Sequence, residues 1–188
     1  MGGLSRSAFR VTQEKVVHSW AMFRLLQRSI VSPGGEEFER TYVSTPGAVG
    51  IVAVDDHNNV VLVSQYRSSF DAMVLEIPAG MRDVEGELPE VTALRELKEE
   101  TGYSASKIDH LGSLLSSPGV TDSSVEVYVA LGLESGVMEP HGPEEQEMKV
   151  LVVPFSQALH MVDTFEITDA KSVYGLLMAA RRYPELLG

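Results

Sequence analysis

The sequence predicts an α+β domain in which strands and helices form layers. Two short apolar runs rich in β-branched residues, 48–54 and 60–65, flank a turn-forming Asp-Asp-His-Asn-Asn segment and indicate a central antiparallel pair of strands. Two later segments carry helical patterns with clear end signals, one starting near Pro89 and the other at Ala170. Strands and helices do not alternate strictly as β-α-β, which favours the α+β class.

An N-terminal β extension is predicted for residues 1–45. Residues 15–28 mix aromatic and branched apolar side chains, and residues 37–43 form a second extended run. The turn sequence Ser32-Pro33-Gly34-Gly35 lies between the two runs. The simplest arrangement is an antiparallel hairpin that precedes the main body of the chain.

The remaining elements follow in order along the main body. Further short apolar runs predict strands at residues 73–77, 111–115, 125–131 and 148–153. Helices are expected from about Pro89 to Gly102, over 156–163, and over 170–182, the last with Asp169 as its N-cap.

Composition excludes several classes of function. The 27 acidic and 15 basic residues give a net charge of −12, which argues against a surface for nucleic acid or anionic membrane. The absence of cysteine excludes disulfides, thiolate metal sites and cysteine nucleophiles, and it fits a reducing compartment. No apolar run reaches the roughly 18 residues of a membrane span, and the N-terminus lacks an apolar signal segment. We therefore expect a cytoplasmic protein.

The acidic residues between Gly80 and Tyr103 stand where a stable helix would not place them. Glu96, Glu99 and Glu100 share one helical face at i,i+3 and i,i+4 separations and repel one another. They also crowd the last turn before Gly102, where the helix dipole disfavours each carboxylate by about 0.3–1 kcal/mol. A local rule broken without structural gain indicates a functional site, and carboxylates suit a divalent cation.

The segment 87–102 reads Glu, seven residues, then Arg-Glu-Leu-Lys-Glu-Glu-Thr-Gly. This pattern resembles the Nudix box, the signature of hydrolases that act on a nucleoside diphosphate linked to another group. Six residues separate Gly80 from Glu87, whereas the usual box has five, and the extra residue falls in the loop rather than in the helix. The resemblance implies a Nudix catalytic domain over 46–188, with a mixed β-sheet sandwiched between helices.

Flanking motifs narrow the resemblance to the ADP-ribose pyrophosphatase branch. They are Pro46-Gly47-Ala48-Val49, Gln65-Tyr66-Arg67, Glu76-Ile77-Pro78-Ala79-Gly80, Ser117-Pro118-Gly119 and Asp169-Ala170-Lys171. In that branch a proline downstream of the box marks the substrate, and Pro118 lies 16 residues after Gly102. The similarity extends over residues 15–182.

The resemblance implies that Glu96 and Glu100 are the principal metal ligands, completed by the backbone carbonyl of Ala79 and by Glu99. The expected ion is Mg²⁺ or Mn²⁺, because hard cations take oxygen ligands. Such ions bridge a pyrophosphate and activate the attacking water. A glutamate face without this context would be read as a solvated surface.

Two further roles follow from the family pattern. Arg95 is expected to orient the glutamates, and Glu87 is expected to anchor the loop before the helix. The general base is expected on the acidic loop 141–147, where either Glu144 or Glu145 is the candidate. A plain acidic surface loop is the alternative interpretation.

Substrate contacts are implied at five positions. Arg67 would bind phosphate or the terminal ribose, with a surface salt bridge as the alternative. Arg40 would reach the nucleotide, in relatives often across a dimer interface. Gly80, Pro118 and Gly119 would line the pocket, although the last two also fit an ordinary turn.

The resulting hypothesis is a homodimeric, Mg²⁺- or Mn²⁺-dependent enzyme that hydrolyses ADP-ribose to AMP and ribose 5-phosphate. Residues 1–45 are expected to form the dimer contact, with Trp20 and Phe23 in its core rather than stacked on adenine. One alternative is a pyrophosphatase for another nucleoside diphosphate sugar or a dinucleotide. The other is a nucleotide sensor without turnover, which would be expected to lack the box glutamates or to carry a basic DNA-binding segment.

Overall fold

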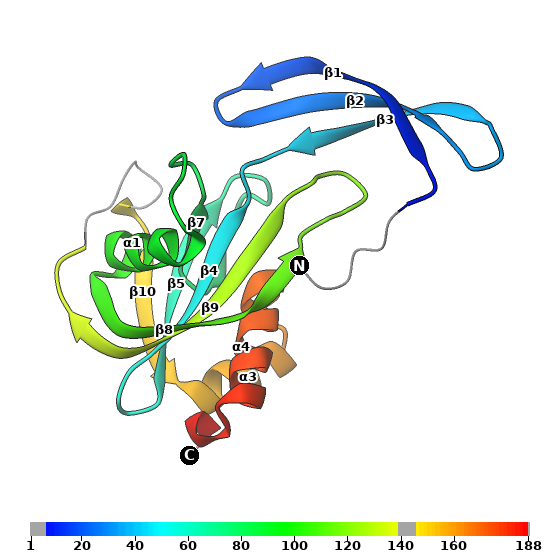
Figure 1. Ribbon diagram of the computed structural model, residues 1–188. Coiled ribbons are helices and arrows are strands. Elements are labelled where there is room, and N and C mark those ends of the chain that lie inside the picture. The colour runs from blue at the N-terminus through cyan, green and yellow to red at the C-terminus, as the bar shows by residue number, and fades with distance from the viewer. Residues whose placement is uncertain (1–6, 139–145, 188) are drawn as a thin grey trace. The chain divides into compact units, whose positions relative to one another are not determined.

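The computed structural model describes residues 7–138 and 146–187 (Figure 1). The chain divides into two compact units. Residues 1–47 and 115–124 form the first unit, and residues 48–114 and 125–188 form the second. Each unit is described separately below.

The first unit contains a three-stranded antiparallel sheet in the order β1-β2-β3. Its strands are β1 (Arg10–Trp20), β2 (Phe23–Val31) and β3 (Glu37–Ser44). The turn predicted at Ser32–Gly35 is confirmed, because the Gly35 N–H donates to the Ser32 carbonyl at 3.0 Å.

The predicted hairpin across this turn is present as β2 and β3, but the run 15–28 is not one strand, because it folds back on itself. Ala21 has a φ of 45°, in the left-handed region, and the chain reverses there so that Trp20 pairs with Phe23. Alanine seldom adopts this conformation, and the local sequence carries no glycine or asparagine to mark the turn. One apolar run therefore gives two strands.

The second unit is built on a mixed seven-stranded sheet in the order β10-β5-β4-β9-β8, with β6 beside β5 and β7 beside β4. Its strands are β4 (Ala48–Val54), β5 (Asn59–Arg67), β6 (Ala72–Glu76), β7 (Ala79–Met81), β8 (Tyr103–Leu115), β9 (Ser124–Ser135) and β10 (Lys149–Pro154). β4 pairs antiparallel with β5 and parallel with β9. The predicted central antiparallel pair is confirmed.

Helices cover both faces of this sheet (Figure 1). They are α1 (Pro89–Thr101), α3 (Phe155–Asp163) and α4 (Ala170–Arg182), followed by the 3₁₀ turn η1 (Pro184–Leu187). On one face Val49 and Ile51 of β4 pack with Leu97 of α1. On the other, Val52 packs in a core with Leu176 of α4. The predicted α/β/α layering is confirmed.

Two strands differ from their predicted form. β8 begins at Tyr103 rather than at residue 111, because its first half alternates exposed polar and partly buried residues instead of forming an apolar run. β7 was not expected, since Pro78 and Gly80 resemble a loop. It nevertheless pairs with β4 through Ala79, Gly80 and Met81.

Both predicted helix ends that bear on the site are confirmed. Gly102 ends α1 in the left-handed region, with φ of 75°, and its N–H donates to the Lys98 carbonyl at 2.8 Å. A Cβ at this position would lie 3.0 Å from the Gly136 carbonyl oxygen, so the close backbone approach also requires glycine. Asp169 caps α4 by accepting from the Ser172 N–H at 3.0 Å. Within the described residues, no helix is both long and apolar enough to cross a membrane.

Candidate active site

The acidic face of α1 rests on β7 and on the turn before it. The Ala79 N–H donates to Glu100 Oε2 at 2.9 Å. A Cβ added at Gly80 would overlap the Glu96 carboxylate, so this carboxylate lies directly against the strand. Glycine is therefore needed for close approach at this position. Three predicted metal-binding positions, Ala79, Glu96 and Glu100, are thus brought together.

Arg95 lies among four carboxylates at the base of this face. Its Nη1 donates to Glu99 Oε2 at 3.0 Å and lies 2.9 Å from Glu96 Oε1. Its Nη2 lies 3.2 Å from Glu87 Oε2 and 3.5 Å from Asp83 Oδ1. The guanidinium therefore ties the loop before α1 to the glutamate face, which is the placement expected for Arg95 and Glu87.

The charges of this cluster do not balance. Burial raises the pKa of Glu96 to about 7, an effect that Arg95 opposes and Glu99 strengthens. The hydrogen bond from Arg95, by contrast, lowers the pKa of Glu87. One guanidinium thus serves several carboxylates, and Glu96 in particular is costly to ionise without a further positive charge.

The donor set of this face fits a hard divalent cation. Glu96, Glu99 and Glu100 supply carboxylate oxygens, and the chain has no thiol that would favour a softer metal. Across 7–138 and 146–187, no three His, Asp or Glu side chains already form a cluster ready to hold a metal. Arg95 engages Glu96 and Glu99, and the Ala79 N–H engages Glu100. A bound cation would replace some of these contacts.

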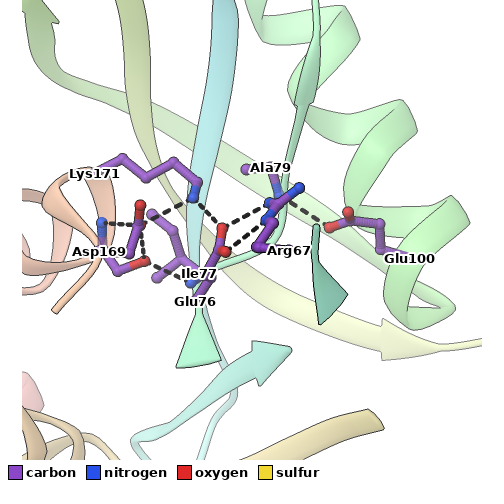
Figure 2. Close-up of polar contacts among 8 residues, drawn as sticks. Arg67, Glu76, Ile77, Ala79, Glu100, Asp169 and Lys171 are labelled. Atoms are coloured by element: carbon purple, nitrogen blue, oxygen red, sulfur yellow. Dashed lines mark hydrogen bonds and ion pairs between the residues drawn. The ribbon is translucent and has the colours of Figure 1, made fainter. Parts of the chain in front are cut away.

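A second charged network surrounds Glu76 at the end of β6 (Figure 2). Arg67 Nε and Nη2 donate to the two Glu76 carboxylate oxygens at 2.7 Å each, and Lys171 Nζ donates to Glu76 Oε2. Lys171 also lies 2.9 Å from Asp169 Oδ2. Burial alone would raise the pKa of Glu76, but Arg67 and Lys171 outweigh it and hold that pKa below its usual range.

Arg67 was predicted as a substrate contact, and the structure places it in an ion pair whose partner is buried. It lines a cavity of about 680 Å³ together with Phe70, Glu76, Asp169 and Lys171. Sequence reasoning gave no role to Glu76 or Lys171. Both lie in recognisable motifs, Glu-Ile-Pro-Ala-Gly and Asp-Ala-Lys, but nothing along the chain indicates that the two side chains pair.

The first unit holds three of the other predicted substrate residues. Arg40, Pro118 and Gly119 line one hollow of about 430 Å³, together with Arg28 and Tyr42. The Arg28 guanidinium lies 4.7 Å from the centre of the Tyr42 ring. Glu144 and Glu145, the predicted general-base candidates, lie outside the described residues.

Comparison with known proteins agrees with this geometry. The family model for the NUDIX domain matches residues 44–174, and the chain belongs to this family. The chain is 40% identical over 170 residues to ADP-ribose pyrophosphatase of Mycobacterium tuberculosis, covering 90% of this chain and 82% of that relative. It is 36% identical over 160 residues to ADP-ribose pyrophosphatase of Bacillus subtilis, covering 85% of this chain and 86% of that relative.

A solved structure agrees with the fold. The crystal structure of an ADP compounds hydrolase superposes with a TM-score of 0.81 and covers 97% of this chain and 98% of its own. Its sequence identity is 22%, so it supports the architecture alone. The predicted membership of the Nudix hydrolases is confirmed by the family match and by the two relatives.

Proposed function

We propose that the protein is a metal-dependent pyrophosphatase that hydrolyses ADP-ribose to AMP and ribose 5-phosphate. The observation that carries the proposal is the convergence of Glu96 and Glu100 on Ala79 and Gly80. The names of the two curated relatives support ADP-ribose as the substrate. Pro118, at the position that marks the substrate in this branch, supports the same choice.

Mg²⁺ or Mn²⁺ is the proposed cofactor, held by Glu96, Glu99 and Glu100 with the backbone carbonyl of Ala79. When bound, the ion would neutralise the pyrophosphate and lower the pKa of the attacking water. Arg95 keeps the carboxylates in place through its contacts with Glu96 and Glu99.

The reaction needs one proton acceptor and one substrate clamp. Water adds to one phosphorus, the bridging P–O bond breaks, and Glu144 or Glu145 takes the proton of the water. Arg67 is proposed to bind a substrate phosphate, and Nη1 is the nitrogen that its two bonds to Glu76 do not use. Arg40, Pro118 and Gly119 are proposed substrate contacts, and their common hollow supports this.

A cytoplasmic homodimer is proposed, with the β1-β2-β3 sheet as its contact surface. Every residue of β1 is exposed, including the large side chains of Val11, Val16, Val17 and Trp20. Burial of apolar area contributes about 25 cal/mol per Å², so covering these exposed side chains favours association. A second copy of the chain is the occupant that the proposed function suggests.

The direct test is an assay of the purified protein against a panel of nucleotide substrates with and without Mg²⁺ or Mn²⁺. We expect metal-dependent formation of AMP and ribose 5-phosphate in equal amounts, and chromatography measures both products. Faster turnover of another nucleoside diphosphate sugar would change the substrate. Tight binding of ADP-ribose with no hydrolysis would instead indicate a sensor.

A further inference from the structure

The start of α4 is tied to the short segment between β6 and β7, just before Ala79, through contacts that no described catalytic step uses. The Ile77 N–H donates to Ser172 Oγ at 2.8 Å, and Ser172 Oγ donates to Asp169 Oδ2 at 2.6 Å. Asp169 in turn holds the Lys171 ammonium. Figure 2 follows this chain of contacts from Asp169 and Lys171 through Glu76 to Arg67.

The two cations beside Glu76 differ in their access to solvent. All three side chains line the cavity described above, but Glu76 is 3% exposed and Lys171 13%, whereas Arg67 is 38% exposed. Lys171 is also held by Asp169, so its ammonium has little freedom to turn. Lys171 therefore acts as a fixed counter-charge, and Arg67 is the cation that can face a ligand.

If Arg67 were the only cation beside Glu76, it could not turn to a ligand without leaving the buried Glu76 carboxylate unpaired. A buried carboxylate that loses its only partner is strongly destabilised, so a lone Arg67 would be retained by Glu76. With Lys171 in place, Glu76 stays neutralised when part of the guanidinium turns to an oxyanion. Arg67 Nη1 is not used in the two bonds to Glu76, which engage Nε and Nη2.

We propose that Lys171 is a positioning residue for substrate binding: it neutralises Glu76 as the less exposed of its two cations and so leaves the more exposed Arg67 available to a phosphate of the substrate. The proposal rests on the proposed function, because that function supplies the pyrophosphate ligand. Asp169 and Ser172 support this role. Asp169 holds the Lys171 ammonium and accepts from the Ser172 N–H, and Ser172 Oγ accepts from the Ile77 N–H next to Glu76.

The test compares steady-state kinetics and ADP-ribose binding for the full-length wild type, Lys171→Met and Lys171→Arg. We expect Lys171→Met to raise KM by about 5- to 10-fold with kcat within about twofold, the pattern of lost ground-state binding. Lys171→Arg restores the buried charge and should keep KM within about twofold of wild type. Melting temperatures are measured alongside.

A double variant separates positioning from simple damage to the fold. Glu76→Gln combined with Lys171→Met removes both buried charges and keeps the net charge of the chain, so Arg67 is no longer retained by a carboxylate. We expect its KM to fall back toward the wild-type value relative to Lys171→Met alone. A merely structural role for Lys171 predicts no such recovery.

Lys107→Met is the matched control, because Lys107 also has an aspartate partner, Asp109 at 2.9 Å, but lies on β8 away from this network. An equal rise of KM in Lys107→Met would overturn the proposal, since it would reflect net charge alone. An unchanged KM in Lys171→Met, or a loss confined to kcat, would overturn it as well.

Equilibrium binding of ADP-ribose without metal keeps this inference apart from the proposed function. If the wild type binds ADP-ribose but does not hydrolyse it when Mg²⁺ or Mn²⁺ is added, and Lys171→Met weakens metal-free binding by about 5- to 10-fold, positioning stands while the proposed activity falls. If the wild type hydrolyses ADP-ribose and Lys171→Met has the same KM, the proposed activity stands while positioning falls. A wild type that neither binds nor hydrolyses ADP-ribose overturns both.

Discussion

The two charged clusters of the second unit are built from the same types of side chain but differ in their ratio of cations to carboxylates. On α1, the single guanidinium of Arg95 contacts Glu87, Glu96, Glu99 and Asp83. At the end of β6, the buried carboxylate of Glu76 has two cations. Burial raises the pKa of Glu96 to about 7, whereas the two cations lower that of Glu76.

This difference distinguishes a site that lacks positive charge from one that is complete. The α1 cluster gains more from an added divalent cation, because a further positive charge favours the ionised form of Glu96, whose pKa burial raises. The Glu76 cluster needs no ion and fixes the strand end instead. Carboxylates paired with arginine therefore form different kinds of site, and the ratio of positive to negative groups is what differs between these two.

The largest effect is expected from Glu96→Gln. This change keeps the shape of the side chain but removes a metal-ligating charge, so kcat should fall by about 10²- to 10³-fold. The melting temperature of the metal-free protein should not fall, because the removed carboxylate is costly to ionise there. An activity assay at saturating Mg²⁺ measures kcat, and calorimetry measures the melting temperature. A variant with full turnover but a lower melting temperature would contradict this prediction.

Glu76→Ala should show the opposite pattern, with stability as its main loss. Removing the shared partner leaves Lys171 with Asp169 alone and Arg67 without its buried carboxylate, which we expect to lower the free energy of unfolding by about 3 kcal/mol. Urea denaturation measures this. Glu14→Gln, which disrupts the exposed pair with Arg28, is the control and should change little. Equal losses in both variants would mean that burial of the Glu76 pair does not matter.

Gly80→Ala should have an intermediate effect on activity. The new methyl group would overlap the Glu96 carboxylate and push it away from β7. We expect kcat to fall by about tenfold, since displacements of about 1 Å at a catalytic site can have effects of this size or larger. Gly34→Ala, at an open turn position in the first unit, is the matched control. Full activity of Gly80→Ala would show that Glu96 need not rest on the strand.

The smallest effect concerns pH. Because the folded state lowers the pKa of Glu76, the unfolded state binds more protons in acid, and stability rises with pH through this range. The contribution of Glu76 should be complete above its unfolded pKa of about 4.3 and lost as pH falls through the lower folded value. The free energy of unfolding, measured by urea denaturation, should therefore fall less steeply between neutral and acidic pH for Glu76→Gln than for the wild type. Parallel curves for variant and wild type would contradict this.

Local patterns were enough to predict α1 and its acidic face. The spacing of Glu96, Glu99 and Glu100, and the glycine at 102, lie within one helix and its cap. Asp169 as the cap of α4 was predicted for the same reason. In both cases the physical cause and its signal are a few residues apart.

Long-range contacts and unmarked turns could not be predicted. Glu76 and Lys171 meet across 95 residues of chain, and no local signal pairs them. The turn at Ala21 lacks the residues that usually mark a left-handed conformation, so residues 15–28 read as one strand. β7 depends on pairing with β4, which overrides the loop character of Pro78 and Gly80.

The central claim is that the glutamate face of α1 takes a divalent cation. Its most direct test is a titration of metal-free protein with Mn²⁺, in which electron paramagnetic resonance counts the free ion, for wild type and for Glu96→Gln/Glu100→Gln. We predict that the wild type removes Mn²⁺ from solution with saturation and that the double variant does so far more weakly. Equal uptake by the two proteins would contradict the claim.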